Sequence, residues 1–176
     1  MNGLVLAGGL SKRMGTDKAF MVYHEKPQYL YLHALLSDYC DEVFVSCNAS
    51  QAKLIQIPKL IDKEPDKGPL SGIKMSFEAA VTDWLIVPCD MPDINTHILS
   101  RVIQQHQSGD SDVTCMIDEN GRINPLLGIY NRTCYDKLMK YAGDSPTEFI
   151  RDLNAQFVTF QLANINTPQD FNNHRS

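Results

Sequence analysis

A short apolar run, Gly3-Leu4-Val5-Leu6, leads directly into Ala7-Gly8-Gly9-Leu10-Ser11-Lys12-Arg13-Met14-Gly15-Thr16-Asp17-Lys18. A run this short that ends in glycines is typical of a strand buried on both faces. Glycine lets the backbone approach a ligand closely, and consecutive amides can form a concave site for an anion. Arg13 and Lys18 add positive charge suited to phosphate oxygens. The sequence therefore predicts a buried strand followed by a polyphosphate-binding loop, although it matches neither the Walker A pattern nor G-x-G-x-x-G.

Apolar runs and helical periodicity alternate along the rest of the chain. Strands are expected at 3–6, 42–47, 59–62, 84–87, 112–117 and 157–162, with another apolar run at 126–130. Helices are expected at 28–39, 71–81, 96–106, 134–141 and 146–153, with Thr96 as an N-cap and Thr167-Pro168 opening a last short helix. This order predicts an α/β fold, with a mainly parallel sheet and helices on both faces. Ligands of such sheets bind at the carboxyl ends of the strands.

Composition narrows the class of protein. The chain has 176 residues, with 16 Lys and Arg against 21 Asp and Glu. At roughly 150 residues per domain, this length predicts a single domain over 1–176. The net charge of −5 argues against a nucleic-acid partner, because phosphates would be repelled. No run approaches the ~20 apolar residues of a membrane span, and the start lacks the basic region of a secretory signal. Five cysteines without a C-x-x-C pair favour the reducing cytoplasm.

Three further segments carry candidate chemistry. Asp90, in Pro88-Cys89-Asp90-Met91-Pro92, directly follows an expected strand, where a carboxylate can hold Mg²⁺ that bridges phosphates. Gly68-Pro69-Leu70-Ser71-Gly72 leads into an expected helix and is either a ligand-contacting turn or a plain one. In Asn164-Ile165-Asn166-Thr167-Pro168, Asn166 and Thr167 are also good candidates for capping the last helix.

Together, these four segments resemble the molybdenum cofactor guanylyltransferase (MobA) family. They occur in the family's order and span almost the whole chain. The glycine-rich loop and the Asp90 segment are shared with other nucleotidyltransferases, whereas Asn164-Ile165-Asn166-Thr167-Pro168 is more specific to this family. The resemblance implies a Rossmann-like nucleotidyltransferase fold. It also implies transfer of GMP from GTP to the terminal phosphate of Mo-molybdopterin, with release of pyrophosphate.

The resemblance also implies roles for individual residues. Lys18 would reach the phosphates together with Arg13, and Asp90 would bind Mg²⁺. Asp62 matches an acidic position near the base, and Asn48 a nucleotide contact, although Ser46 could carry that second role. The remaining positions are backbone contacts to the nucleotide and two asparagines on the pterin side: Leu6, Ala7, Gly8, Gly9, Gly15, Asn164 and Asn166. Transient contact with proteins that supply molybdopterin, or with particular molybdoenzymes, is compatible with this reading.

Three positions bear on the choice of substrate. In the resembled families Gly8 often marks the guanine-using branch, where cytidine-using relatives carry alanine. The family often has histidine where this chain has Asn124, and glycine where it has Glu25. These two departures concern the acceptor side or the loop geometry more than the triphosphate.

Two other readings stay open on the sequence alone. The first is a related nucleotidyltransferase that uses CTP with molybdopterin, or a sugar phosphate as acceptor. The second is a non-catalytic molybdopterin carrier, against which Lys18 and Asp90 argue, because a carrier needs no metal-held leaving group. A carrier would bind without releasing pyrophosphate.

Overall fold

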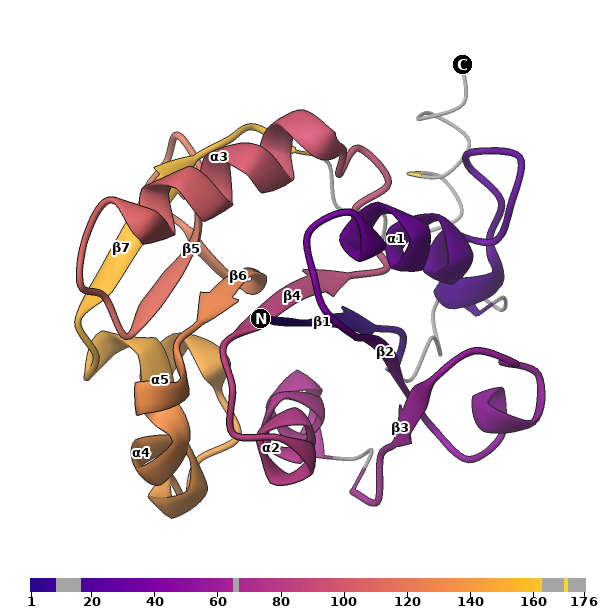
Figure 1. Cartoon of the computed structure of the whole chain (residues 1–176), viewed down its shortest axis with the longest axis horizontal. Coiled ribbons are helices and arrows are strands. Elements are labelled where there is room, and N and C mark those ends of the chain that lie inside the picture. Colours follow the sequence, from indigo (N-terminus) through magenta and orange to yellow (C-terminus); the bar gives the residue numbers. More distant parts are fainter. Residues whose placement is uncertain (9–16, 65–66, 163–169, 171–176) are drawn as a thin grey trace.

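The structure is a computed structural model that describes residues 1–8, 17–64, 67–162 and 170. Over this part of the chain, seven strands form one sheet in the order β3-β2-β1-β4-β6-β5-β7 (Figure 1). The strands are β1 Asn2–Leu6, β2 Val43–Cys47, β3 Lys59–Ile61, β4 Trp84–Pro88, β5 Val113–Ile117, β6 Ile123–Tyr130 and β7 Ala155–Thr159. The helices are α1 Gln28–Ser37, α2 Pro69–Ala79, α3 Thr96–Gln107, α4 Tyr135–Lys140 and α5 Pro146–Arg151, and short 3₁₀ turns include η1 Lys18–Phe20 and η2 Gln51–Lys53.

Strand pairing confirms the prediction of a mainly parallel sheet. β1 pairs parallel with both β2 and β4, and β2 with β3. β6 runs antiparallel to its two neighbours, β4 and β5, while β7 is parallel to β5. The antiparallel β6 is reached from β5 through a tight turn in which Gly121 has a φ of 79° and its amide donates to Asp118 O at 3.0 Å. An Asn-Gly pair, here Asn120-Gly121, is typical of such a turn.

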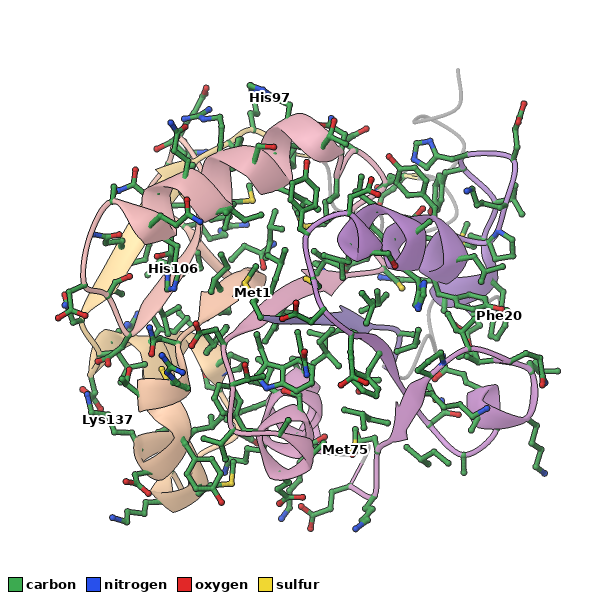
Figure 2. All side chains as sticks on the ribbon, in the orientation of Figure 1. Met1, Phe20, Met75, His97, His106 and Lys137 are labelled. Carbon is green, nitrogen blue, oxygen red and sulfur yellow. The ribbon has the colours of Figure 1, made fainter. Side chains whose placement is uncertain are left out.

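Helices cover both faces of the sheet, as predicted. α1 and α3 lie on one face, and α2, α4 and α5 lie on the other (Figure 1). Successive residues of β1 alternate between the two cores: Leu4 and Leu6 pack with the α2 side, Val5 and Ala7 with the α1 side. This is why the central strands are mostly apolar on both faces, with Asn2 and Ser46 as buried polar exceptions. Figure 2 shows the side chains that fill the space between the sheet and the helices.

Several predicted boundaries differ from the observed ones. α3 is capped by Asn95, whose side chain accepts from Ile98 N at 3.2 Å, so Thr96 is the first helical residue and the cap prediction was wrong. The last strand is Ala155–Thr159 instead of 157–162, because its register follows the pairing with β5. The predicted helix at Thr167-Pro168 lies outside the described residues. None of the described helices is long and apolar enough to cross a membrane.

The chain makes a tight turn between η1 and α1. Val22 and Pro27 form an isolated antiparallel bridge, and Gln28 N donates to Met21 O at 2.9 Å. Glu25, within this turn, has a φ of 61°. This left-handed conformation costs an L-residue about 1–2 kcal/mol, whereas glycine adopts it freely. The glycine common at this family position therefore has a structural explanation.

The strain at Glu25 leads to a first prediction. Glu25→Gly should raise the free energy of unfolding by up to about 1 kcal/mol, because relief of backbone strain exceeds the added entropy of the unfolded chain. Urea unfolding measures the change. The matched control is Lys26→Gly at the exposed neighbour, which has no positive φ to relieve and should lose stability. Equal losses in both variants would contradict this explanation.

Candidate active site

The carboxyl end of β1 is fixed by backbone hydrogen bonds to both neighbouring strands. Ala7 N and Gly8 N both donate to Ser46 O, at 2.9 and 3.0 Å. On the other side, Cys89 N donates to Leu6 O at 3.2 Å. The amides of Ala7 and Gly8 are thus already engaged within the protein. A nucleotide at this end of β1 would therefore contact atoms of Leu6, Ala7 and Gly8 other than these two amide N–H groups.

Lys18 and Asp90 meet at this end of the sheet. Lys18 belongs to η1, and Asp90 follows β4, whose last residue Pro88 pairs with Leu6. The Lys18 Nζ lies 3.7 Å from Asp90 Oδ2, and the two side chains are 20% and 31% exposed. The structure therefore brings together two of the predicted catalytic residues from distant parts of the chain.

Burial makes the Asp90 carboxylate unusual. Desolvation raises the pKa of Asp90 above its ordinary value, although the nearby Lys18 ammonium lowers the pKa in part. The charged form is thus incompletely compensated by the protein. A hard carboxylate oxygen in this state suits Mg²⁺, which commonly takes one or two carboxylates and completes its shell with water and phosphate oxygens. No cluster of three or more metal-ligating side chains occurs among the described residues.

Tyr23 is a neighbour of Asp90 that the sequence analysis did not single out. Burial, followed by the charges of Asp90 and Cys89, raises the pKa of Tyr23 to about 12. The phenol is therefore neutral near pH 7. The turn that carries Tyr23 is fixed against the loop after β4, since His24 Nε2 donates to Pro92 O at 2.8 Å and its ring stacks on Tyr31. A lone tyrosine outside any motif gave no signal in the sequence.

Asn124 lies beside the same loop. Its Nδ2 is 3.1 Å from Met91 Sδ, and its Oδ1 accepts from Leu126 N at 3.1 Å. The position at which the family often carries histidine is thus next to the segment that holds Asp90. That the change concerns the acceptor side stays a prediction from the sequence.

At the end of β2, Asn48 is engaged in a local turn. Its Oδ1 accepts from Ser50 N at 3.0 Å, from Ser50 Oγ at 2.6 Å and from Gln51 N at 2.9 Å. Ser46 is only 2% exposed, and its Oγ is the nearest atom, at 2.7 Å, to a Cβ built on Gly72. The Ser46 side chain therefore packs under α2, which leaves Asn48 as the candidate for a nucleotide contact on this strand.

The segment Gly68-Pro69-Leu70-Ser71-Gly72 combines structural and potential binding roles. Gly68, with a φ of 73°, precedes α2, and Pro69 is its first residue. A side chain at Gly72 would collide with Ser46 and Leu6, so this glycine permits close packing of α2 on the sheet. Ser71, between them, donates from Oγ to Asp62 Oδ2 at 2.6 Å. The second glycine is thus a packing position.

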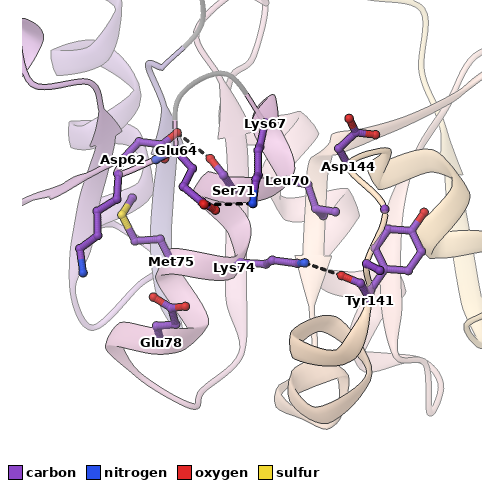
Figure 3. A pocket seen from close by; sticks show the side chains of 13 residues that line it. Asp62, Glu64, Lys67, Leu70, Ser71, Lys74, Met75, Glu78, Tyr141 and Asp144 are labelled. Atoms are coloured by element: carbon purple, nitrogen blue, oxygen red, sulfur yellow. Dashed lines mark hydrogen bonds and ion pairs between the residues drawn. The ribbon is translucent and has the colours of Figure 1, made fainter.

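Asp62 lies at the edge of a large cavity. The cavity of about 730 Å³ is formed by α2, by the residues after β3 and by the loop after α4 (Figure 3). Asp62 Oδ1 accepts from Glu64 N at 2.9 Å, so each carboxylate oxygen already holds one hydrogen bond. A carboxylate has about four acceptor positions, and two remain for a ligand. Across the cavity, Lys74 Nζ donates to Tyr141 O.

The other predicted site residues lie outside the described residues. They are Gly9, Arg13 and Gly15 in the loop after β1, and Asn164 and Asn166 near the end of the chain. Their roles stay predictions from the sequence.

Comparison with known proteins identifies the family. The model of the MobA-like NTP transferase domain matches residues 3–157. The molybdenum cofactor guanylyltransferase of Pseudomonas aeruginosa (PAO1) is 30% identical, over 98% of this chain and 93% of that protein. The molybdenum cofactor biosynthesis bifunctional protein of Synechocystis is 33% identical over 96% of this chain, which spans about half (52%) of that longer protein.

Solved structures agree on the fold. The molybdopterin-guanine dinucleotide biosynthesis protein A of Archaeoglobus fulgidus superposes with a TM-score of 0.80 at 18% sequence identity, covering 98% of this chain and 96% of that one. The predicted Rossmann-like α/β fold is thereby confirmed. With a family match over most of its length and a 30% identical relative covered almost end to end, the chain belongs to the molybdenum cofactor guanylyltransferase family of MobA-like nucleotidyltransferases.

Proposed function

We propose that this protein transfers GMP from GTP to the terminal phosphate of Mo-molybdopterin, with Mg²⁺ as its metal. The observation that carries the proposal is the Lys18–Asp90 pair, with Nζ 3.7 Å from Oδ2, at the carboxyl ends of β1 and β4. A cation beside a half-buried carboxylate at this edge suits a polyphosphate and its metal. The names of the relatives support GTP and molybdopterin as the substrates.

The reaction would form one P–O bond and break another. A phosphate oxygen of the pterin attacks the α-phosphorus of GTP, and the bond to the bridging oxygen breaks, with its electron pair leaving on pyrophosphate. The attacking phosphate is already ionised, so no strong general base is needed. Catalysis of this kind rests on positioning and on preorganised charge.

The candidate site residues that the structure describes each have a role in this reaction. Lys18 binds phosphate oxygens and stabilises the negative charge that develops on them. Asp90 holds Mg²⁺, which when bound neutralises charge on the phosphates. Asp62 accepts from N1–H and N2–H of guanine, a donor pair that adenine lacks, and Ser71 fixes the orientation of that carboxylate. Asn48 contributes on the β2 side. Arg13, Gly9 and Gly15 are assigned to the phosphates, and Asn164 and Asn166 to the pterin, on the sequence alone.

The state of the cysteines bears on the cellular compartment of the reaction. All five cysteines are free, and four of them are buried. Free thiols fit a reducing compartment, so we place the reaction in the cytoplasm. Proteins that supply molybdopterin or receive the product would then make transient contact with this enzyme.

The experiment that tests the function is a comparison of nucleotides. Calorimetry with Mg²⁺ should show tighter binding of GTP than of CTP, UTP or ATP. Pyrophosphate should be released from GTP once Mo-molybdopterin is added. Preference for CTP would move the protein to a sister activity on the same fold. Binding of molybdopterin without any pyrophosphate release would indicate a carrier.

Asp90→Asn separates activity from stability. The variant should lose Mg²⁺-dependent turnover, because an amide is a poor ligand for the metal. At pH 7 it should also unfold at a higher temperature than the wild type. The pKa of Asp90 is raised in the folded state, so ionisation above that pKa destabilises the fold, and the neutral amide removes this cost.

The pH dependence of this gain provides an internal control. The gain should shrink as the pH falls through the raised pKa of Asp90 and disappear below about 3.9, the ordinary pKa of Asp, where Asp90 is protonated in both the folded and the unfolded state. Full turnover in the variant would contradict the role in metal binding. An unfolding temperature below that of the wild type at pH 7 would contradict the assigned cost of ionisation.

Gly8→Ala tests whether the missing side chain admits guanine. Among the described residues, the nearest atom to a Cβ at this position would be Ser46 O at 3.9 Å, an ordinary van der Waals contact. Neither packing against the described part of the chain nor a positive φ therefore requires glycine here. The variant should keep its stability but bind GTP about tenfold more weakly, equivalent to about 1.4 kcal/mol, with CTP affected less. An equal loss for both nucleotides would separate Gly8 from the choice of base.

A further inference from the structure

Gln51 is a buried polar side chain that the proposed function does not use. It lies in η2, just after β2, and is only 3% exposed. Its Oε1 accepts from Asn48 N at 2.9 Å. Its Nε2 donates to Ala7 O at 2.9 Å and to Asp17 Oδ2 at 2.7 Å. The amide therefore uses both of its N–H groups and its carbonyl oxygen.

The two acceptors of Gln51 flank the glycine-rich segment 9–16. Ala7 lies at the end of β1 before this segment, and Asp17 lies directly after it. Asp17 is fixed a second time, because its Oδ1 accepts from Ala19 N at 3.0 Å and so caps η1. η1 carries Lys18, whose Nζ lies 3.7 Å from Asp90 Oδ2. Gln51 is thus linked to the Lys18–Asp90 pair through Asp17, which it bonds directly and which caps the turn that carries Lys18.

We propose that Gln51 is a positioning residue for nucleotide binding, which acts by holding the end of β1 and the start of η1 in a fixed relation. This inference rests on the proposed function, since it takes Lys18 and the end of β1 as the nucleotide contacts. Fixing the two flanks together sets where Lys18 stands relative to Gly8. It also reduces the conformational freedom that nucleotide binding would otherwise have to remove.

The chemistry of the three contacts explains why a glutamine is present. The site needs two donors and one acceptor in a single planar group, which among uncharged side chains only an amide supplies. A carboxylate of the same shape would face both Ala7 O and Asp17 Oδ2 with acceptors. An apolar side chain of similar length would fill the space but leave the Asp17 carboxylate without this donor. Hydrogen bonds to charged groups are the stronger ones, so the link to Asp17 carries most of the effect.

The test is calorimetric binding of GTP with Mg²⁺ to the full chain. Gln51→Glu keeps the shape and the contact to Asn48 N but opposes two acceptors, and the dissociation constant should rise about ten- to hundredfold. Gln51→Met loses the polar contacts without adding charge, and its dissociation constant for GTP should also rise. This variant provides the test if Gln51→Glu does not fold. Partial unfolding would lower the binding stoichiometry and leave the dissociation constant of the folded fraction unchanged. If Gln51 acts by positioning, the stoichiometry should stay unchanged and the dissociation constant should rise.

Asp17→Asn provides a rescue. Its oxygen can still accept from Ala19 N, and its amide can donate to the carboxylate introduced by Gln51→Glu. The double variant should therefore bind GTP more tightly than Gln51→Glu alone, and short of the wild type because Ala7 O still faces an acceptor. The matched control is Gln156→Glu on β7, at the opposite edge of the sheet, which should leave the dissociation constant unchanged.

The outcomes distinguish failure of the proposed function from failure of the role assigned to Gln51. A wild type that binds no nucleotide overturns the proposed function, and this inference with it. A wild type that binds GTP, with Lys18→Ala weakened but Gln51→Glu and Gln51→Met unchanged, overturns only the inference. A double variant no better than Gln51→Glu overturns the specific link through Asp17.

Discussion

Parallel pairing of β1 with β2 on one side and with β4 on the other is the constraint on which the rest of the structure depends. In this register Leu6 lies opposite both Ser46 and Pro88, so three strands end at the same level. Residues just beyond each strand must then lie close together, whatever their separation in the sequence. Asp90 meets the segment that carries Lys18 for this reason. Helices on both faces follow from the same arrangement, because no face of the central strands is left for water.

The pair at this edge is held in an electrostatically incomplete state. Burial raises the pKa of Asp90, and the Lys18 ammonium, 3.7 Å away, offsets the effect only in part. A structural ion pair would be expected to lower the pKa of its carboxyl instead, as Lys137 does for Asp112. The two aspartates therefore differ in the balance between desolvation and their partners: the partners of Asp112 outweigh the effect of burial, and Lys18 does not outweigh it at Asp90. Perturbed groups of this kind concentrate at functional sites.

The elements of the fold were largely predictable, because periodicity and burial act locally. Each expected strand and helix within the described residues exists, with shifts at the ends. The direction of β6 was not predictable, since an apolar run reads the same in a parallel or an antiparallel strand. The position of β7 was missed by a few residues because pairing with β5 fixes it, and Phe157 is 38% exposed despite its apolar character. The cap of α3 was misplaced by one residue, since Asn95 and Thr96 are both good capping residues.

Some residues of the candidate site could likewise be singled out from the sequence, and others only from the structure. Lys18 and Asp90 could be singled out because their types and their places after strands carry chemical meaning on their own, and the structure brings the two together. Asp62 was singled out only by the resemblance to the family, and the roles of all three stay predictions. Gln51 and Tyr23 could not be singled out, because only their contacts in three dimensions place them beside the candidate site. A glutamine on a surface turn and one that bonds Ala7 O and Asp17 Oδ2 have the same appearance in a sequence. Ala7 and Asp17 lie on either side of segment 9–16 in the sequence, yet one side chain from a neighbouring element bonds both. Buried side chains that bond two separate parts of a binding site are therefore where positioning residues should be sought.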